Sequence, residues 1–243
     1  MLPLLFALTA ALYASVGFGG GSTYSALLAI GGVDYRLLPV VSLACNIIVV
    51  AGGTLRFARA GLLPWRRALP LALAAAPFAW AGGLTPIGER AFFLLLGGAL
   101  AVAGLLLLVR SRGDATPRAG PAWREPAAGA GIGYLSGLVG IGGGIFLAPV
   151  LLLTGWDRPR AVAATASLFI LVNSVAGLAG QMLKLGTMAS AALPFWPLAA
   201  AVLLGGQLGS WAGARILPEA LVRRGTGLLI LIVAVRLLWQ TPG

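Results

Sequence analysis

Two glycine clusters are the residues whose type and spacing point most directly to chemistry. The first is the run Val-Gly-Phe-Gly-Gly-Gly at residues 16–21, and the second is Val-Gly-Ile-Gly-Gly-Gly at residues 139–144. Glycine tolerates positive φ angles and lets a ligand approach the backbone closely. A helix start follows each cluster, and helix N-termini favour anions. Each cluster is therefore a candidate binding site for a small anion. The candidate residues are Gly19, Gly20, Gly21, Ser22, Thr23, Gly142, Gly143, Gly144 and Ile145.

Polar side chains within the apolar segments are few, and they are the second group of candidates. Ser42 and Ser167 occupy equivalent places after the two clusters. Hydroxyl and amide groups in membrane helices more often bond to their own helix or to a neighbouring one. As a set facing the glycine clusters, however, they would suit the oxygens of an oxyanion. The candidate substrate ligands are Ser42, Asn46, Thr165, Ser167 and Asn173.

Helix packing is the simpler explanation of the glycines. Small residues let membrane helices approach closely, and 36 of the 243 residues are glycine. Packing accounts for most of them, including the pairs at residues 52–53 and 97–98. For the two repeated clusters we favour a binding site. Neither cluster is a P-loop, because no Lys-Ser or Lys-Thr pair follows it.

The elements that carry these residues are predicted to be membrane helices. The chain is 59% hydrophobic and only 9% charged, whereas a soluble domain is about 25% charged. The apolar segments are residues 2–33, 37–58, 66–84, 90–109, 127–155, 160–183, 188–213 and 221–239. With about 20 residues needed per crossing, the sequence predicts an all-α polytopic membrane protein of about eight to ten membrane helices.

The first segment of each half is too long for one crossing. Residues 2–33 would form a helix about 48 Å long, while the hydrocarbon core is only about 30 Å thick. The glycine cluster interrupts this segment near its middle, and the same holds for residues 127–155. We therefore expect each to form two shorter helices joined in a hairpin within the membrane, followed by three spans.

The two halves form a repeat, with residues 1–109 and 127–243 separated by a polar linker at 110–126. Asp34 and Asp157 follow the clusters at the same distance. If each first segment crossed once, ten of the 17 basic residues would lie on one side and seven on the other. With hairpins the division becomes thirteen against four, which fits the positive-inside rule better. The hairpins also make the two repeats inverted, with the linker in the cytoplasm and both termini outside.

Several function classes are disfavoured. The net charge of +11 does not indicate nucleic-acid binding, because the arginines lie in separate loops. There is no histidine, and Cys45 is the single cysteine, so disulfides and cysteine metal clusters are excluded and no cofactor is expected. The six acidic residues fall in loops or at segment ends, which disfavours a proton relay. The apolar N-terminus is expected to remain as a membrane segment rather than to be cleaved as a signal peptide.

The second repeat carries the most specific pattern. Residues 137–144 read Gly-Leu-Val-Gly-Ile-Gly-Gly-Gly, Pro149 follows, and residues 164–169 read Ala-Thr-Ala-Ser-Leu-Phe. The first repeat departs by carrying Ala26 in place of Pro149. With these features the chain resembles the sulfite exporter TauE/SafE family of bacterial membrane permeases. The resemblance implies a multi-pass inner-membrane protein that exports sulfite, a sulfonate such as sulfoacetate, or a related organic anion. Sulfur comes from the resemblance alone, because the residues by themselves indicate only a small anion.

The leading hypothesis is therefore a secondary carrier for a small oxyanion, surrounded by membrane lipid, with alternating access about the two hairpins. An anion that leaves a cell with a negative interior gains about 2.3 kcal/mol per charge per 100 mV, so export needs no coupling residue. Three alternatives stay open: an anion channel, a protein whose glycines serve packing only, and a membrane enzyme or assembly factor. The last is disfavoured because no buried acid–base pair is present. The sequence leaves the oligomeric state open.

Overall fold

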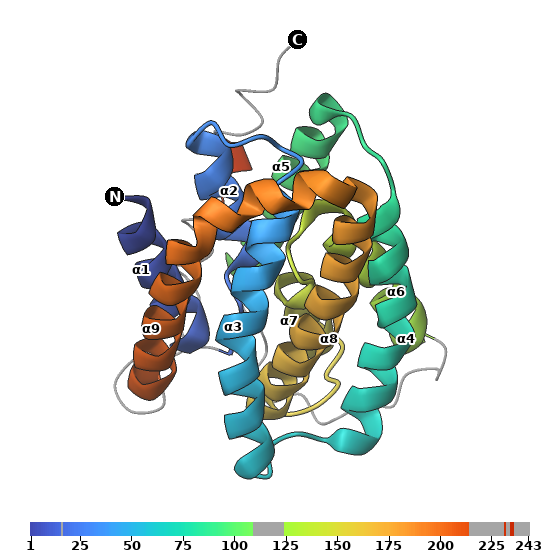
Figure 1. Cartoon of the computed structure of the whole chain (residues 1–243). Helices are drawn as coiled ribbons and strands as arrows, with labels where there is room; N and C mark the ends of the chain where they lie inside the picture. The colour runs from blue at the N-terminus through green and yellow to red at the C-terminus, as the bar shows by residue number, and fades with distance from the viewer. Residues whose placement is uncertain (16, 109–123, 214–230, 232–233, 236–243) are drawn as a thin grey trace.

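The computed structural model describes residues 1–15, 17–108, 124–213, 231 and 234–235, and every element in this part of the chain is helical (Figure 1). The helices are α1 Leu2–Ser15, α2 Gly21–Ile30, α3 Leu38–Arg59, α4 Trp65–Leu84, α5 Glu89–Leu108, α6 Arg124–Val139, α7 Gly144–Leu153, α8 Pro159–Leu185, the 3-10 helix η1 Gly186–Phe195, and α9 Trp196–Gly213.

Both glycine clusters interrupt the helices as expected. Residues 2–30 form α1 and α2, and residues 124–153 form α6 and α7, with the glycines between the two helices of each pair. In Figure 1, α2 returns toward the end of the molecule at which α1 begins. Each long segment is therefore a pair of short helices. We call residues 17–20 the first glycine turn and residues 140–143 the second glycine turn.

Helices α3 and α8 cross the centre of the molecule side by side and run in opposite directions. Leu43, near the start of α3, lies beside Gly177, near the end of α8. The hydroxyl of Thr54, near the end of α3, forms a hydrogen bond of 2.9 Å with the hydroxyl of Ser167, near the start of α8. Helices α3 and α8 are therefore antiparallel.

Small residues bring two further helix pairs into close contact. A methyl group on Gly133 would lie 2.7 Å from the Ala75 carbonyl oxygen, and one on Gly137 would overlap the carbonyl of Ala79. These contacts join α6 to α4. Gly205 and Gly209 contact α1 in the same way, which joins α9 to α1. Close backbone approach at small residues is a common way of packing membrane helices, so these glycines serve packing.

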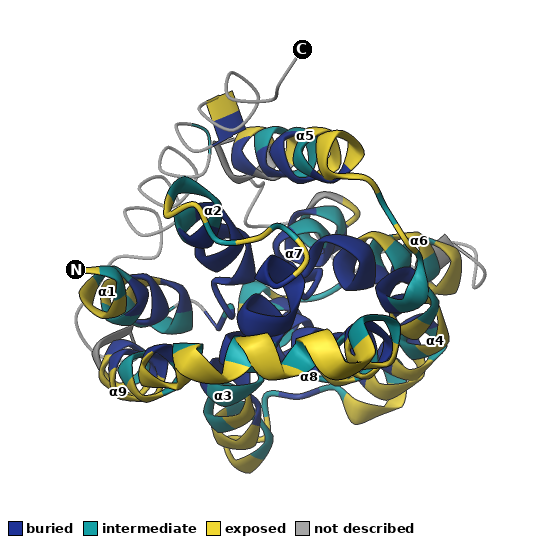
Figure 2. Ribbon diagram, turned by 45° about the horizontal axis from the view of Figure 1, so that its top comes forward, coloured by how far each residue is buried: buried dark blue, intermediate teal, exposed yellow. Residues whose placement is uncertain are grey.

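Many large apolar side chains are exposed on the outside of the helices, while the buried interior (Figure 2) contains polar as well as apolar side chains. Leu4, Leu8 and Leu12 form an exposed stripe along α1, and Leu204 and Leu208 on α9 are each 66% exposed. The fully buried side chains include Asn46, Ser167, Asn173 and Gln181, among other polar residues. An apolar patch of this extent would be a liability in water, whereas lipid accommodates it.

Helix lengths agree with a membrane protein. Helix α3 has 22 residues and α8 has 27, lengths of about 33 and 40 Å that cover a hydrocarbon core of about 30 Å. Within the described residues, two helical stretches, Leu38–Arg59 and Pro159–Trp211, are long and apolar enough to cross a membrane.

Two of the expected boundaries differ from those observed. Helix α6 begins at Arg124, so the last residues of the predicted linker 110–126 are helical, and the rest of that linker lies outside the described residues. The segment predicted at 188–213 begins as the 3-10 helix η1. The segment predicted at 221–239 lies almost wholly outside the described residues.

Candidate functional site

The two glycine turns meet at one side chain, Asn46, at the middle of α3. The Asn46 Nδ2 group donates a hydrogen bond of 3.1 Å to the carbonyl oxygen of Ile141 in the second turn. A methyl group on Gly19, in the first turn, would overlap the Asn46 amide. One on Gly142, in the second turn, would lie 2.7 Å from Asn46 Nδ2. The turns are therefore neighbours at the depth of the centre of α3.

The backbone of both turns requires glycine. Gly20 and Gly143, the residues immediately before α2 and α7, have φ angles of 88° and 82°. In this region a side chain costs about 1–2 kcal/mol. Neither helix has a side-chain hydrogen bond at its N-cap. The first N–H groups of a helix have no partner within the helix, so both helix starts can serve as anion donors.

Three buried hydroxyl groups next to the turns have no hydrogen-bond partner among the described residues: those of Tyr24, Ser136 and Ser174. A methyl group on Gly20 would come within 3.0 Å of the Tyr24 hydroxyl, and one on Gly142 within 3.0 Å of Ser174 Oγ. Ser136 lies beside Gly143. Each hydroxyl carries a proton that it can donate, and leaving it unpaired costs about 1–3 kcal/mol. The site therefore suits a ligand that accepts several hydrogen bonds.

The predicted ligands near the first turn lie in a buried polar group. The hydroxyls of Thr23 and Tyr13 form a hydrogen bond of 2.8 Å, and those of Ser42 and Ser25 form another of 2.8 Å. Ser22 is buried in the first turn of α2. These hydroxyls line the contacts between α1, α2 and α3, and those of Thr23 and Ser42 already have partners.

The predicted ligands on α8 are less closely tied to the turns. Thr165 donates to the carbonyl of Ala161 in its own helix, and Ser167 pairs with Thr54 of α3. Asn173 donates to the carbonyl of Phe169, also in its own helix, while its Oδ1 is buried without a partner among the described residues. The contacts of Thr165 and Ser167 are those of helix packing.

At the start of α7, Gly144 packs against Ile170, and Ile145 is buried as part of an apolar cluster. Ile145 can therefore offer a ligand only its backbone. Tyr24, Ser136 and Ser174 were not among the predicted site residues. Ser174 could have been found, since it follows Asn173 in a polar pair within an apolar helix. Nothing in the sequence marks Ser136 or Tyr24 as facing a turn.

The site is uncharged on the protein side. The closest neighbours of the turns are amide, hydroxyl, aromatic, aliphatic and backbone groups. Among the described residues no three His, Cys, Asp or Glu side chains lie close enough to hold a metal ion. Positive potential at the site comes from the starts of α2 and α7.

Comparison with known proteins identifies a family model and a relative that each match nearly the whole chain. The family model described as "Sulfite exporter TauE/SafE" matches residues 2–237. A protein of Sinorhizobium fredii (strain NBRC 101917 / NGR234), named "Probable membrane transporter protein y4hK", is 34% identical over 243 residues, covering 98% of this chain and 97% of its own length. No solved structure matches the chain.

Proposed function

The chain belongs to the sulfite exporter TauE/SafE family and is a membrane transporter, and on that premise we propose that it exports a small oxyanion through the site between its two glycine turns. The substrate class is sulfite, a sulfonate such as sulfoacetate, or a related organic anion. The observation that carries the proposal is the set of three unpaired buried hydroxyls beside two uncapped helix starts.

A small oxyanion would fit this set chemically. Its oxygens accept hydrogen bonds from hydroxyl and backbone N–H groups, and its charge is favoured by helix N-termini. The three hydroxyls and Asn46 come from four different helices, α2, α3, α6 and α8. A ligand between the turns would thus contact both repeats, as alternating access about a midplane site requires.

The protein's neutral site makes transport electrogenic in this account. An anion that crosses without a compensating side-chain charge moves its own charge through the membrane potential. Export then gains about 2.3 kcal/mol per charge per 100 mV. Asp34 and Asp157 lie in loops, and Glu89 lies in the first turn of α5, an arrangement that disfavours a proton relay through the site.

We further propose that the two repeats are inverted. The antiparallel contacts of α3 and α8, which occupy equivalent places in the two repeats, support this. The packing of α1 on α9 and of the equivalent helices α6 on α4 supports it as well. The end of the molecule with Arg56, Arg59, Arg66, Arg67, Arg158 and Arg160 would face the cytoplasm, in a multi-pass protein of the bacterial inner membrane.

The proposal is tested by measuring anion efflux from proteoliposomes that contain purified protein. Ser174→Ala removes one donor, so the half-saturating concentration of the substrate should rise about fivefold to tenfold, with little change in thermal stability. Ser210→Ala is the matched control, because the Ser210 hydroxyl bonds to a carbonyl of its own helix. Equal effects of the two substitutions would contradict the proposed site. Flux that never saturates would instead indicate a channel.

A further inference from the structure

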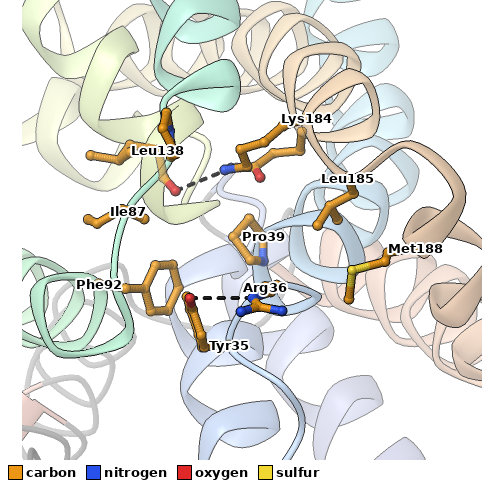
Figure 3. Close-up of a pocket in the computed structure, with 11 residues that line it drawn as sticks. Tyr35, Arg36, Pro39, Ile87, Phe92, Leu138, Lys184, Leu185 and Met188 are labelled. Carbon is orange, nitrogen blue, oxygen red and sulfur yellow. Dashed lines mark hydrogen bonds between the residues drawn. The ribbon is translucent and has the colours of Figure 1, made fainter.

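A second feature with the chemistry of an anion site lies at the opposite end from the arginine-rich end. It is an open pocket of about 330 Å³ between the starts of α3 and α5 and the ends of α6 and α8. Two cationic side chains line it, Arg36 and Lys184, and no acidic side chain is among its lining residues (Figure 3). The pocket thus carries positive charge at its mouth.

The hydrogen bonds of both cationic side chains are to neutral groups. Arg36 Nε donates a hydrogen bond of 3.4 Å to the Tyr35 hydroxyl. This hydrogen bond is the largest of the effects that raise the pKa of the Arg36 guanidinium; the charge interactions with Tyr35, Asp34 and Glu89 raise it further. The Asp34 carboxylate accepts from the backbone N–H of Arg36, not from its guanidinium. Lys184 Nζ donates to the carbonyl oxygen of Thr85 over 3.3 Å, so its partner is neutral.

The floor of the pocket adjoins the second glycine turn. Pro39 and Leu138 line the pocket, and a methyl group on Gly140, in the turn, would overlap Pro39. Gln181, another lining residue, donates to the carbonyls of Gly137 and Leu138 over 2.8 and 3.2 Å. The end of α6 is thereby fixed to α8 just before the turn. A few residues therefore separate the pocket from the site between the turns.

From this geometry we propose that the pocket is an outer anion-binding vestibule, in which Arg36 and Lys184 hold a small sulfonate, sulfite or carboxylate before release or after arrival. The place of this vestibule on the transport path rests on the proposed function. Anion binding in the vestibule can be measured separately, without measuring transport.

Cysteine labelling tests binding directly. Cys45 is buried, while Met188 lines the pocket and is 43% exposed, so Met188→Cys introduces an accessible thiol at the mouth. Purified Met188→Cys protein is labelled with a maleimide in sodium methanesulfonate or in sodium chloride of equal ionic strength. If a bound anion blocks the thiol, methanesulfonate at twice its dissociation constant should slow labelling about threefold. Arg36→Gln or Lys184→Gln should abolish this protection.

Two further variants separate the vestibule from the midplane site. Arg90→Gln removes an exposed charge at the same end that does not line the pocket, and it should leave protection intact. Asn46→Ala should also leave it intact, even where transport is lost. Protection that chloride gives equally, or that survives both Arg36→Gln and Lys184→Gln, would overturn the vestibule. Protection lost in Asn46→Ala alone would show that the thiol reports the site between the turns.

Discussion

Asn46 is the residue on which both halves of the candidate site converge. Its amide contacts the first glycine turn at Gly19 and the second at Gly142, and it donates to Ile141. Its Oδ1 is buried without a partner among the described residues. One amide thus contacts both glycine turns at the depth where the substrate is proposed to bind.

Replacing Asn46 by alanine should therefore impair transport more than folding. We expect efflux to fall by about tenfold or more, since the turns lose their link, while the free energy of unfolding falls by about 1–2 kcal/mol for the lost hydrogen bond. Flux in proteoliposomes and thermal unfolding in detergent measure the two effects. Gln207→Ala, which removes a surface amide bonded to Arg56, is the control. Equal loss of flux in both variants would argue against the role of Asn46.

At the scale of the elements, the breaks within the long apolar segments could be predicted from the sequence. The side-chain contacts between different helices could not. The length of residues 2–33 and the glycines inside it predict two short helices, because one helix would exceed the bilayer. Sequence equivalence suggested the same role for Ser42 and Ser167. The structure instead pairs Ser42 with Ser25 of α2 and Ser167 with Thr54 of α3. Their surroundings differ because α3 and α8 pack directly on each other, a tertiary fact that the local sequence does not contain.

The glycine turns and ordinary positive-φ glycines should respond differently to alanine. Gly143 has a φ of 82° and contacts Phe169 and Ile132, while Gly61 has a φ of 68° and nothing within 4 Å of an added methyl group. Both substitutions should cost about 1–2 kcal/mol in backbone strain. Only Gly143→Ala should also displace the start of α7 and lower efflux strongly. Comparable efflux in the two variants, at matched protein levels, would count against a functional turn.

The packing glycines form a separate class with a separate test. Gly137 lies against the backbone of Ala79 in α4, whereas Gly98 on α5 has open space around an added methyl group. Gly137→Leu should force α4 and α6 apart and leave little monodisperse protein on size-exclusion chromatography, because backbone cannot move aside as a side chain can. Gly98→Leu should be tolerated. Good recovery of Gly137→Leu would mean that this helix contact is not needed for the fold.

For the whole molecule, the charge distribution predicts which end faces the cytoplasm. Ala60 lies at the arginine-rich end of the molecule, and Thr187 lies at the end that carries the vestibule. Both residues are exposed. With Cys45 buried, Ala60→Cys and Thr187→Cys each provide one accessible thiol. A membrane-impermeant thiol reagent added to intact cells should label position 187 and spare position 60 until the membrane is opened. Labelling of both, or the reverse pattern, would refute the proposed orientation.

The central claim concerns an anion that moves its charge through the site between the turns, and the current across a supported membrane tests it most directly. Purified protein is exposed to steps of sulfite, sulfoacetate, taurine and small carboxylates. We predict a saturable current for a sulfur oxyanion or a related carboxylate that is strongly reduced in Gly143→Ala and retained in Gly61→Ala. The absence of both current and binding for all of these compounds would contradict the account, as would a current that Gly143→Ala leaves unchanged.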